Sequence, residues 1–258
     1  MCPDLEPLRT RPLADFSALR ARAKPLTPWP IAHDGAAAAE PLVDVRDYGV
    51  RGRNHYAHAR NPPYWGAAPG AIDGLFARVG VAQRLQSVDA RLSRSGLALW
   101  LHDAWRPRAV QAYFHDVWTP TALRARHPDW DDAAIRAETA KYWSAPTVDR
   151  DRPAPHETGG AVDVTLVWRE DATPLWMGSL FDDPAPLSQP DYFERLDPTQ
   201  WSFSAEEARA NRRVLHWVMI EAGFAPHPHE WWHFSYGDQY WARNAGAPAA
   251  LYGLAAPA

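Results

Sequence analysis

Strands are predicted where apolar and polar residues alternate or where apolar residues form a short run. Residues 41–49 alternate between the two classes, which is typical of a half-buried strand. Residues 97–101 form an apolar run that predicts a buried strand, and residues 161–168 are rich in β-forming side chains. Residues 229–236 predict a fourth strand, near the C-terminus.

Helices are predicted where apolar residues recur every three or four positions. The series Val81, Leu85, Val88 and Leu92 marks one face of a helix, and Gly96 follows where a glycine commonly ends one. Further helices are predicted to begin in residues 103–107, to lie within residues 120–155, and to begin with a capping box at Ser204 to Glu207.

Helices and strands follow one another without the regular alternation of a parallel sheet. This order predicts an α+β fold, a compact single domain in which helices flank a central, mostly antiparallel sheet. Residues 1–40 are rich in proline and alanine, and we expect them to form an irregular N-terminal arm. Residues 41–258 then form the main domain.

Charge and cysteine content narrow the kinds of partner and site. The net charge of −4, from 27 basic and 31 acidic residues, argues against a nucleic-acid partner. The sequence has no apolar stretch that approaches a membrane span and no apolar core of a secretory signal near its start, so we expect a cytoplasmic protein. With Cys2 as the single cysteine, a metal would need histidine and carboxylate ligands. The sequence does not indicate an oligomeric state.

Two segments could supply such ligands. The first runs from His156 to Asp163, and Gly159 and Gly160 within it would let the chain turn back so that both side chains reach one point. The second is Glu230-Trp-Trp-His233, from which His233 would approach on a neighbouring strand. Two imidazoles and one carboxylate satisfy the usual count of protein ligands at a catalytic zinc, which keeps a fourth position open.

Two more side chains fit hydrolysis at such a metal. Glu230 lies three residues before His233, where its carboxylate could take a proton from the attacking water and return it to the leaving amine. Arg106, in Trp105-Arg106-Pro107, could stabilise the oxyanion that forms when an amide is attacked.

These segments resemble the D-alanyl-D-alanine dipeptidases, zinc peptidases related to the D,D-carboxypeptidases. The shared pattern is His-x-x-Gly-x-Ala-x-Asp followed later by Glu-Trp-Trp-His, with an aromatic-Arg-Pro element before both. Residues 176–182 resemble the family's Met-Gly-x-x-Phe-Asp segment, and residues 211–224 resemble its last helix. The likeness extends over residues 41–243.

The resemblance implies that the main domain, residues 41–258, is a zinc peptidase catalytic domain. It implies one zinc ion per chain, held by His156, Asp163 and His233, with Glu230 as general base and acid and Arg106 as the stabilising cation. Asp182 would lie near the free amino group of a small dipeptide substrate, and the implied substrate is D-Ala-D-Ala.

One departure from the family pattern leaves the substrate open. Ala154 stands two residues before the first histidine, where the family usually has serine. Alternatives are a different small amide, or a D,D- or L,D-carboxypeptidase that acts on cell-wall peptides. We expect His227 and His229 to lie beside the ligands or to be exposed, rather than to bind the metal themselves.

Two other classes of function fit less well. Non-haem iron oxygenases also use two histidines and a carboxylate, but typically with one residue between His and Asp, whereas six separate His156 from Asp163. A binding protein that had lost catalysis would not need Glu230 and Arg106. Biosynthesis, D-alanine salvage and antibiotic resistance are all compatible with the predicted reaction.

Overall fold

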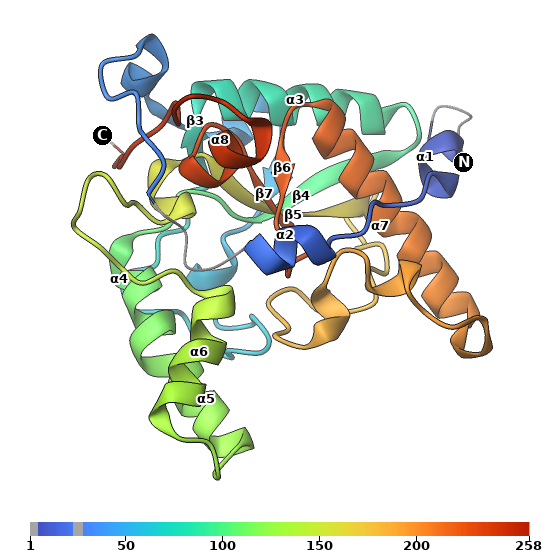
Figure 1. Ribbon diagram of the computed structural model, residues 1–258. Helices are drawn as coiled ribbons and strands as arrows, with labels where there is room; N and C mark the ends of the chain where they lie inside the picture. Colours follow the sequence, from blue (N-terminus) through green and yellow to red (C-terminus); the bar gives the residue numbers. More distant parts are fainter. Residues whose placement is uncertain (1–4, 23–27, 258) are drawn as a thin grey trace.

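The computed structural model describes residues 5–22 and 28–257, and a five-stranded sheet lies at its centre (Figure 1). The strand order is β2-β4-β5-β7-β6, in which only the pair β2 and β4 is parallel. The predicted α+β class with a mostly antiparallel sheet is therefore confirmed. The strands are β2 (Arg51–Gly52), β4 (Leu97–Asp103), β5 (Ala161–Trp168), β7 (His233–Ser235) and β6 (Ala225–Pro226).

Smaller elements surround this sheet. Strands β1 (Leu42–Asp44) and β3 (Phe76–Arg78) form a separate antiparallel pair. A π-helical segment, Tyr113–Trp118, joins α4 to α5, and short 3-10 turns fill the connection between β5 and α7. The helices are α1 (Glu6–Thr10), α2 (Ser17–Arg22), α3 (Val79–Ser93), α4 (Arg108–Ala112), α5 (Thr119–Arg126), α6 (Asp132–Tyr142), α7 (Phe203–Glu221) and α8 (Gln239–Ala245).

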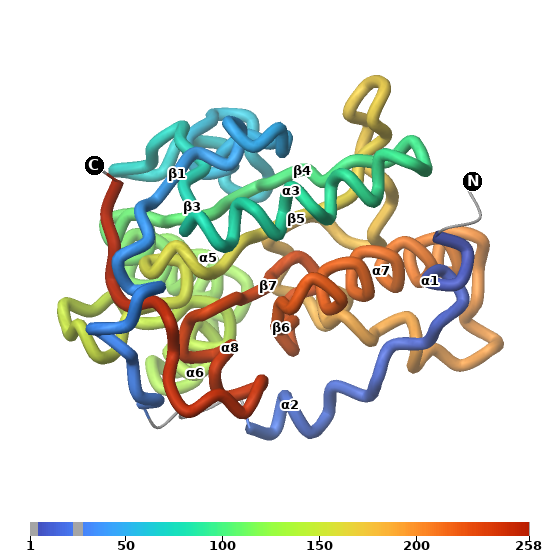
Figure 2. Tube along the Cα trace, turned by 90° about the horizontal axis from the view of Figure 1, so that it is seen from above, coloured from blue at the N-terminus to red at the C-terminus, as the bar shows by residue number. Residues whose placement is uncertain are grey.

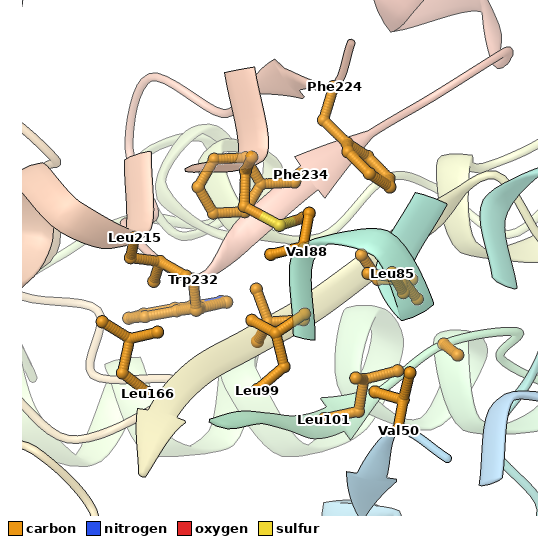
Figure 3. Close-up of a cluster of buried hydrophobic side chains, with 14 of the residues drawn as sticks. Val50, Leu85, Val88, Leu99, Leu101, Leu166, Leu215, Phe224, Trp232 and Phe234 are labelled. Atoms are coloured by element: carbon orange, nitrogen blue, oxygen red, sulfur yellow. The ribbon is translucent and has the colours of Figure 1, made fainter. Parts of the chain in front are cut away.

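The core lies between the sheet and the two long helices, α3 and α7. Figure 3 shows Leu85 and Val88 of α3 and Leu215 of α7 gathered with Leu99 of β4 and Leu166 of β5. Side chains alternate between the two faces of a strand, so the residues next to these apolar ones point away from the core. The sheet therefore has an apolar face under α3 and α7 and a second face that is available for a site.

Several predicted elements have different bounds in the structure. Residues 41–49 form a strand only at Leu42–Asp44, because the Asp44 side chain accepts a hydrogen bond from the Arg46 amide and starts a 3-10 turn. The strand predicted at 229–236 is limited to His233–Ser235, because the residues before it form a turn. The helix within 81–92 and the strands at 97–101 and 161–168 are confirmed, whereas residues 120–155, predicted to hold one helix, contain α6 and most of α5.

Two predicted helix starts are wrong. Asp103 ends β4, and the next helix begins only at Arg108, after Pro107. The helix α7 is capped by Ser202, whose hydroxyl accepts a hydrogen bond from the Ala205 amide at 3.2 Å, and not by Ser204. In both cases the structure uses a capping position that lies close to the one that the sequence pattern indicated.

The N-terminal arm is less irregular than predicted, since it contains α1 and α2, and α1 lies against α7 (Figure 2). Arg9 donates a hydrogen bond to the Asn211 side chain, and Arg20 forms an ion pair with the buried Asp191 at 2.7 Å. A domain boundary at residue 40 stays a prediction. Among the helices of the described residues, none is long and apolar enough to cross a membrane.

Truncation of the core at β4 tests this packing. Leu99 is fully buried between the sheet and the long helices, so Leu99→Ala should lower the free energy of unfolding by about 2–5 kcal/mol. Leu180→Ala is the matched control, because that side chain is 57% exposed and should change stability by less than about 0.5 kcal/mol. Urea unfolding measures both, and equal effects of the two variants would contradict the assigned core.

Candidate metal centre and active site

The sheet register brings acidic and imidazole side chains side by side. Asp163 of β5 lies opposite Asp103 of β4 on one side and opposite His233 of β7 on the other. Asp163 alternates with the core residues of β5, and His233 alternates with the buried Phe234, so both point to the face away from α3 and α7.

A bulge in β4 adds Asp103 to this face. The pairing of β4 with β5 shifts between Leu101 and Asp103, so Asp103 leaves the alternation that holds Leu99 and Leu101 in the core. Arg106 then contacts both Asp103 and Asp163.

A tight turn before β5 delivers His156. Gly159 has φ +71°, and a Cβ atom there would lie 2.3 Å from Leu42 Cδ2. A Cβ atom on Gly160 would lie 2.5 Å from the carbonyl oxygen of Tyr236. The two glycines therefore let the chain fold back close to its neighbours, as the sequence predicted.

Three donor atoms converge where these elements meet. His156 Nε2 lies 3.1 Å from His233 Nδ1 and 3.5 Å from Asp163 Oδ2, and His233 Nδ1 lies 3.1 Å from Asp163 Oδ1. Ligand atoms about 2.0–2.2 Å from a tetrahedral zinc ion are roughly 3.3–3.6 Å apart. The three side chains form a candidate metal site among the described residues, and their spacing fits such an ion.

Neighbouring groups prepare these side chains to bind a metal. His156 Nδ1 lies 2.7 Å from the Ala104 carbonyl oxygen, to which it donates when Nε2 carries the lone pair. Asp163 Oδ1 is buried and accepts no hydrogen bond of good geometry. Burial lowers the pKa of His233, which favours the neutral form that binds metals.

The two carboxyls beside Arg106 differ in acidity. Burial raises the pKa of Asp103. Burial also opposes ionisation of Asp163, but the adjacent imidazoles of His156 and His233 hold the pKa of that carboxyl well below its usual range. Asp163 is thus the carboxylate that is ready to serve as a ligand.

All three guanidinium nitrogens of Arg106 form hydrogen bonds within the protein. Its Nε donates to Asp103 at 2.8 Å, its Nη1 donates to Gln111 at 3.0 Å, and its Nη2 lies 3.2 Å from both Tyr56 and Asp163. Burial disfavours its charge, but the Tyr56 hydroxyl and the carboxyls of Asp103 and Asp163 raise the pKa of Arg106 above its ordinary value. It therefore stays positively charged and in one orientation.

Glu230 lies in the turn that leads into β7. Its Oε2 is 3.7 Å from His233 Nδ1 and 3.4 Å from His227 Nδ1, and the side chain is buried. The structure therefore brings together the predicted Glu230, Arg106 and all three candidate ligands. His227 and His229 line the same cavity and lie outside the group of three donors.

Asp182 joins the site through two tyrosines that the sequence did not single out. Tyr56 and Tyr64 donate hydrogen bonds to Asp182 Oδ2 at 2.6 and 2.8 Å. Burial and the nearby Asp163 raise the pKa of Asp182 to about 7 in spite of these bonds. Asp182 also has a positive φ of 58°, a conformation that aspartate tolerates better than most residues.

The site opens into a cavity of about 270 Å³. Cavities that hold drug-sized ligands have volumes of about 300–1,000 Å³, so this one suits a smaller molecule. Ala154 forms part of the wall, as do residues 28 and 29 of the N-terminal arm. The wall also includes Trp118, Tyr142, Trp143, Asp182, Trp232 and Arg243.

Comparison with known proteins identifies the family. The model of peptidase family M15 described as D-Ala-D-Ala dipeptidase matches residues 42–247. The chain belongs to this family. The M15 assignment confirms the resemblance noted in the sequence, and with it the class of enzyme, a metallopeptidase.

Individual relatives agree with the M15 assignment. The D-alanyl-D-alanine dipeptidase of Synechocystis sp. is 31% identical over 217 residues, which cover 79% of this chain and 84% of that protein. The D-alanyl-D-alanine dipeptidase of Enterococcus faecalis is 29% identical over 203 residues, which cover 77% and 91%. A solved structure of the vancomycin resistance D,D-pentapeptidase VanY with Zn(II) overlaps loosely, with a TM-score of 0.41, 14% identity and coverage of 70% and 83%.

Removal of a candidate ligand tests the metal centre. Loss of a hydrogen-bond partner of a ligand typically costs about 10- to 100-fold in metal affinity, so His233→Ala should weaken zinc binding by more than that. His115→Ala is the control, because His115 pairs with Asp116 on the π-helical segment, outside the site. Competition with a chromophoric chelator measures the affinity, and wild-type affinity in His233→Ala would contradict the site.

The pKa of Asp182 predicts a pH-dependent stability of the metal-free protein. The pKa rises from 3.8 to about 7 on folding, so between these values the folded chain holds a proton that the unfolded chain has released. This contribution to stability is present at low pH and lost as the pH rises through about 7. The asparagine in Asp182→Asn does not titrate, so the variant does not lose stability in this way. Its unfolding free energy relative to that of the wild type should therefore increase as the pH rises from about 4 to about 7. A difference in unfolding free energy that does not vary with pH would contradict the raised pKa.

Proposed function

We propose that the protein hydrolyses the dipeptide D-Ala-D-Ala with one zinc ion bound by His156, Asp163 and His233. The observation that carries this proposal is the convergence of the three donor atoms beside Glu230 and Arg106 in a small cavity. Membership of the D-Ala-D-Ala dipeptidase family and the names of both curated relatives support the substrate.

The donor set fits zinc better than other common ions. Two imidazoles and a carboxylate are typical of a catalytic zinc site with an open position, and the three donor atoms here lie 3.1–3.5 Å apart. When bound there, zinc lowers the pKa of its water to about 7 and polarises a carbonyl group. The family assignment also favours a peptidase over an iron oxygenase.

Glu230 and Arg106 supply the proton transfer and the charge stabilisation. The Glu230 carboxylate lies close to the donor atoms, where it can accept a proton from the attacking water and later deliver it to the leaving amine. The Arg106 guanidinium is already fixed by Asp103 and Gln111, so it need not reorganise when the amide oxygen becomes negative. Such fixed charges are most effective in a site shielded from water.

Asp182 binds the free amino group of the substrate. Its carboxyl lies in the cavity with one oxygen held by Tyr56 and Tyr64. With a pKa of about 7, it ionises readily when an ammonium group enters, and this pairing favours a free dipeptide over the end of a long peptide. A cell-wall carboxypeptidase, whose substrate continues beyond that amino group, is therefore the second candidate.

Hydrolysis by the zinc-loaded protein tests this proposal. Alanine release should occur from D-Ala-D-Ala and be much slower from L-Ala-L-Ala and from a longer peptide that ends in D-Ala-D-Ala. Glu230→Gln should lower kcat by about 10²- to 10⁴-fold while zinc binding persists. Glu207→Gln is the matched control, because that side chain pairs with Arg9 on the surface.

Each outcome assigns a different activity. Release from the longer peptide alone would move the assignment to a carboxypeptidase. With zinc bound, release from none of the three peptides would rule out D-Ala-D-Ala and point to another small amide, which Ala154 in the cavity wall could accommodate.

A further inference from the structure

The hydroxyl group of Tyr56 lies between two charged groups that have separate tasks in the proposed reaction. It lies 3.2 Å from Arg106 Nη2 and 2.6 Å from Asp182 Oδ2. A guanidinium can only donate hydrogen bonds, so the Tyr56 oxygen accepts from Arg106 and its single proton is directed to the Asp182 carboxyl. One side chain thereby connects the acid that would bind the substrate ammonium with the cation that would stabilise the oxyanion.

A closed ring of hydrogen bonds fixes the position of Tyr56. The Asn54 side chain accepts a hydrogen bond from the Tyr56 amide at 3.1 Å and donates one to Asp103 Oδ1 at 3.2 Å. Asp103 Oδ2 in turn accepts from Arg106 Nε at 2.8 Å, and Arg106 Nη2 donates back to the Tyr56 hydroxyl. Buried polar networks in which every member is paired hold their groups in one arrangement. The ring therefore sets where the Tyr56 hydroxyl meets the guanidinium.

The Nη2 atom of Arg106 depends on Tyr56 for one of its two acceptors. The other acceptor is Asp163 Oδ2, also at 3.2 Å, and this carboxyl is a candidate metal ligand. Without the Tyr56 hydroxyl, Nη2 would keep only the contact to that carboxyl. The guanidinium would then be less strictly oriented, although Asp103 and Gln111 still bond to its other nitrogens.

Tyr64 offers a natural comparison, because it holds the same carboxyl from another direction. Its hydroxyl donates to Asp182 Oδ2 at 2.8 Å. Within the described part of the chain, the hydrogen bonds of the Arg106 guanidinium include one to Tyr56 and none to Tyr64. The two tyrosines thus share their contact to Asp182 and differ in their contact to Arg106.

We propose that Tyr56 is a positioning residue that couples recognition of the substrate amino group at Asp182 to charge stabilisation by Arg106. This inference rests on the proposed function, because it assumes that a dipeptide places its ammonium at Asp182 and its amide oxygen near Arg106. Tyr56 keeps these two groups at one separation, so a dipeptide whose ammonium is bound presents its amide to a guanidinium that is already oriented. Substrate binding and turnover then depend on the same hydroxyl group.

Steady-state kinetics of the zinc-loaded protein separate the two contacts. Tyr64→Phe removes only a hydrogen bond to Asp182, so it should raise KM for D-Ala-D-Ala about 3- to 10-fold and change kcat by less than about twofold. Tyr56→Phe also removes the contact to Arg106, so it should raise KM and lower kcat by about tenfold. This loss is smaller than the roughly 10²- to 10³-fold typical for a lost oxyanion donor, because Arg106 itself remains.

A tetrahedral anionic ligand measures the same effect without turnover. In the phosphinate analogue of D-Ala-D-Ala, a negatively charged PO₂–CH₂ unit replaces the amide, while the ammonium and carboxylate ends are kept. Such a ligand resembles the transition state more closely than the substrate does. By isothermal titration calorimetry, Tyr56→Phe should weaken its binding about tenfold more than Tyr64→Phe does.

Tyr192→Phe is the control for loss of a tyrosine hydroxyl. Tyr192 lies in a 3-10 turn and does not line the cavity, so this variant should keep the KM, kcat and phosphinate affinity of the wild type. Tyr56→Phe retains the aromatic ring, whose centre lies 4.9 Å from that of Phe114. Zinc affinity equal to that of the wild type would show that its site is folded.

The results separate this inference from the proposed function. If Tyr56→Phe changes KM alone, or weakens the phosphinate no more than Tyr64→Phe does, the coupling is wrong. If the phosphinate shows the expected difference while the wild type does not hydrolyse D-Ala-D-Ala, the role of Tyr56 stands and the proposed reaction fails. A wild-type protein that neither hydrolyses the dipeptide nor binds the phosphinate overturns both.

Discussion

Two buried carboxyl groups on neighbouring strands are held together by Arg106, and the site depends on this contact. Asp103 and Asp163 are almost fully buried and directly opposed across β4 and β5, so two negative charges there would repel each other strongly. Arg106 bonds to both, and the rings of Tyr56 and Trp143 lie 4.8 Å from its guanidinium carbon. Arg106 offsets part of this repulsion, and His156 and His233 hold the pKa of the Asp163 carboxyl well below its usual range, so this carboxyl is in the form that binds metals.

One face of the sheet packs into the apolar core, and the other face carries the candidate active site. Leu99 and Leu166 pack under α3 and α7, while Asp163, one residue along from the core positions of β5, faces the cavity. The same strands that are fixed by apolar packing thereby set the positions of the polar groups. Loops supply the remaining members, Glu230 and Asp182, at the ends of this rigid framework.

The sequence predicted His156 and Asp163 because their spacing reflects a local turn followed directly by a strand. At Gly159 and Gly160 a side chain would collide with neighbouring atoms, so the turn requires glycine. Strand β5 spans the same residues, 161–168, as the predicted strand. Tyr56 and Tyr64 were not predictable in the same way, because their relation to Asp182 exists only after residues more than a hundred positions apart meet. The shortest strands, such as β2 and β6, span two residues each and have no periodicity to recognise.

Part of the cavity wall comes from outside the segment of the chain that the family model matches. The Trp29 indole lines the cavity, yet it belongs to a segment that precedes the part of the chain shared with the family. The sequence of this segment can change without a change at His156, Asp163 or His233, which lie far from it in the chain. Substitutions in the arm can therefore change the shape of the cavity while the candidate metal ligands stay in place.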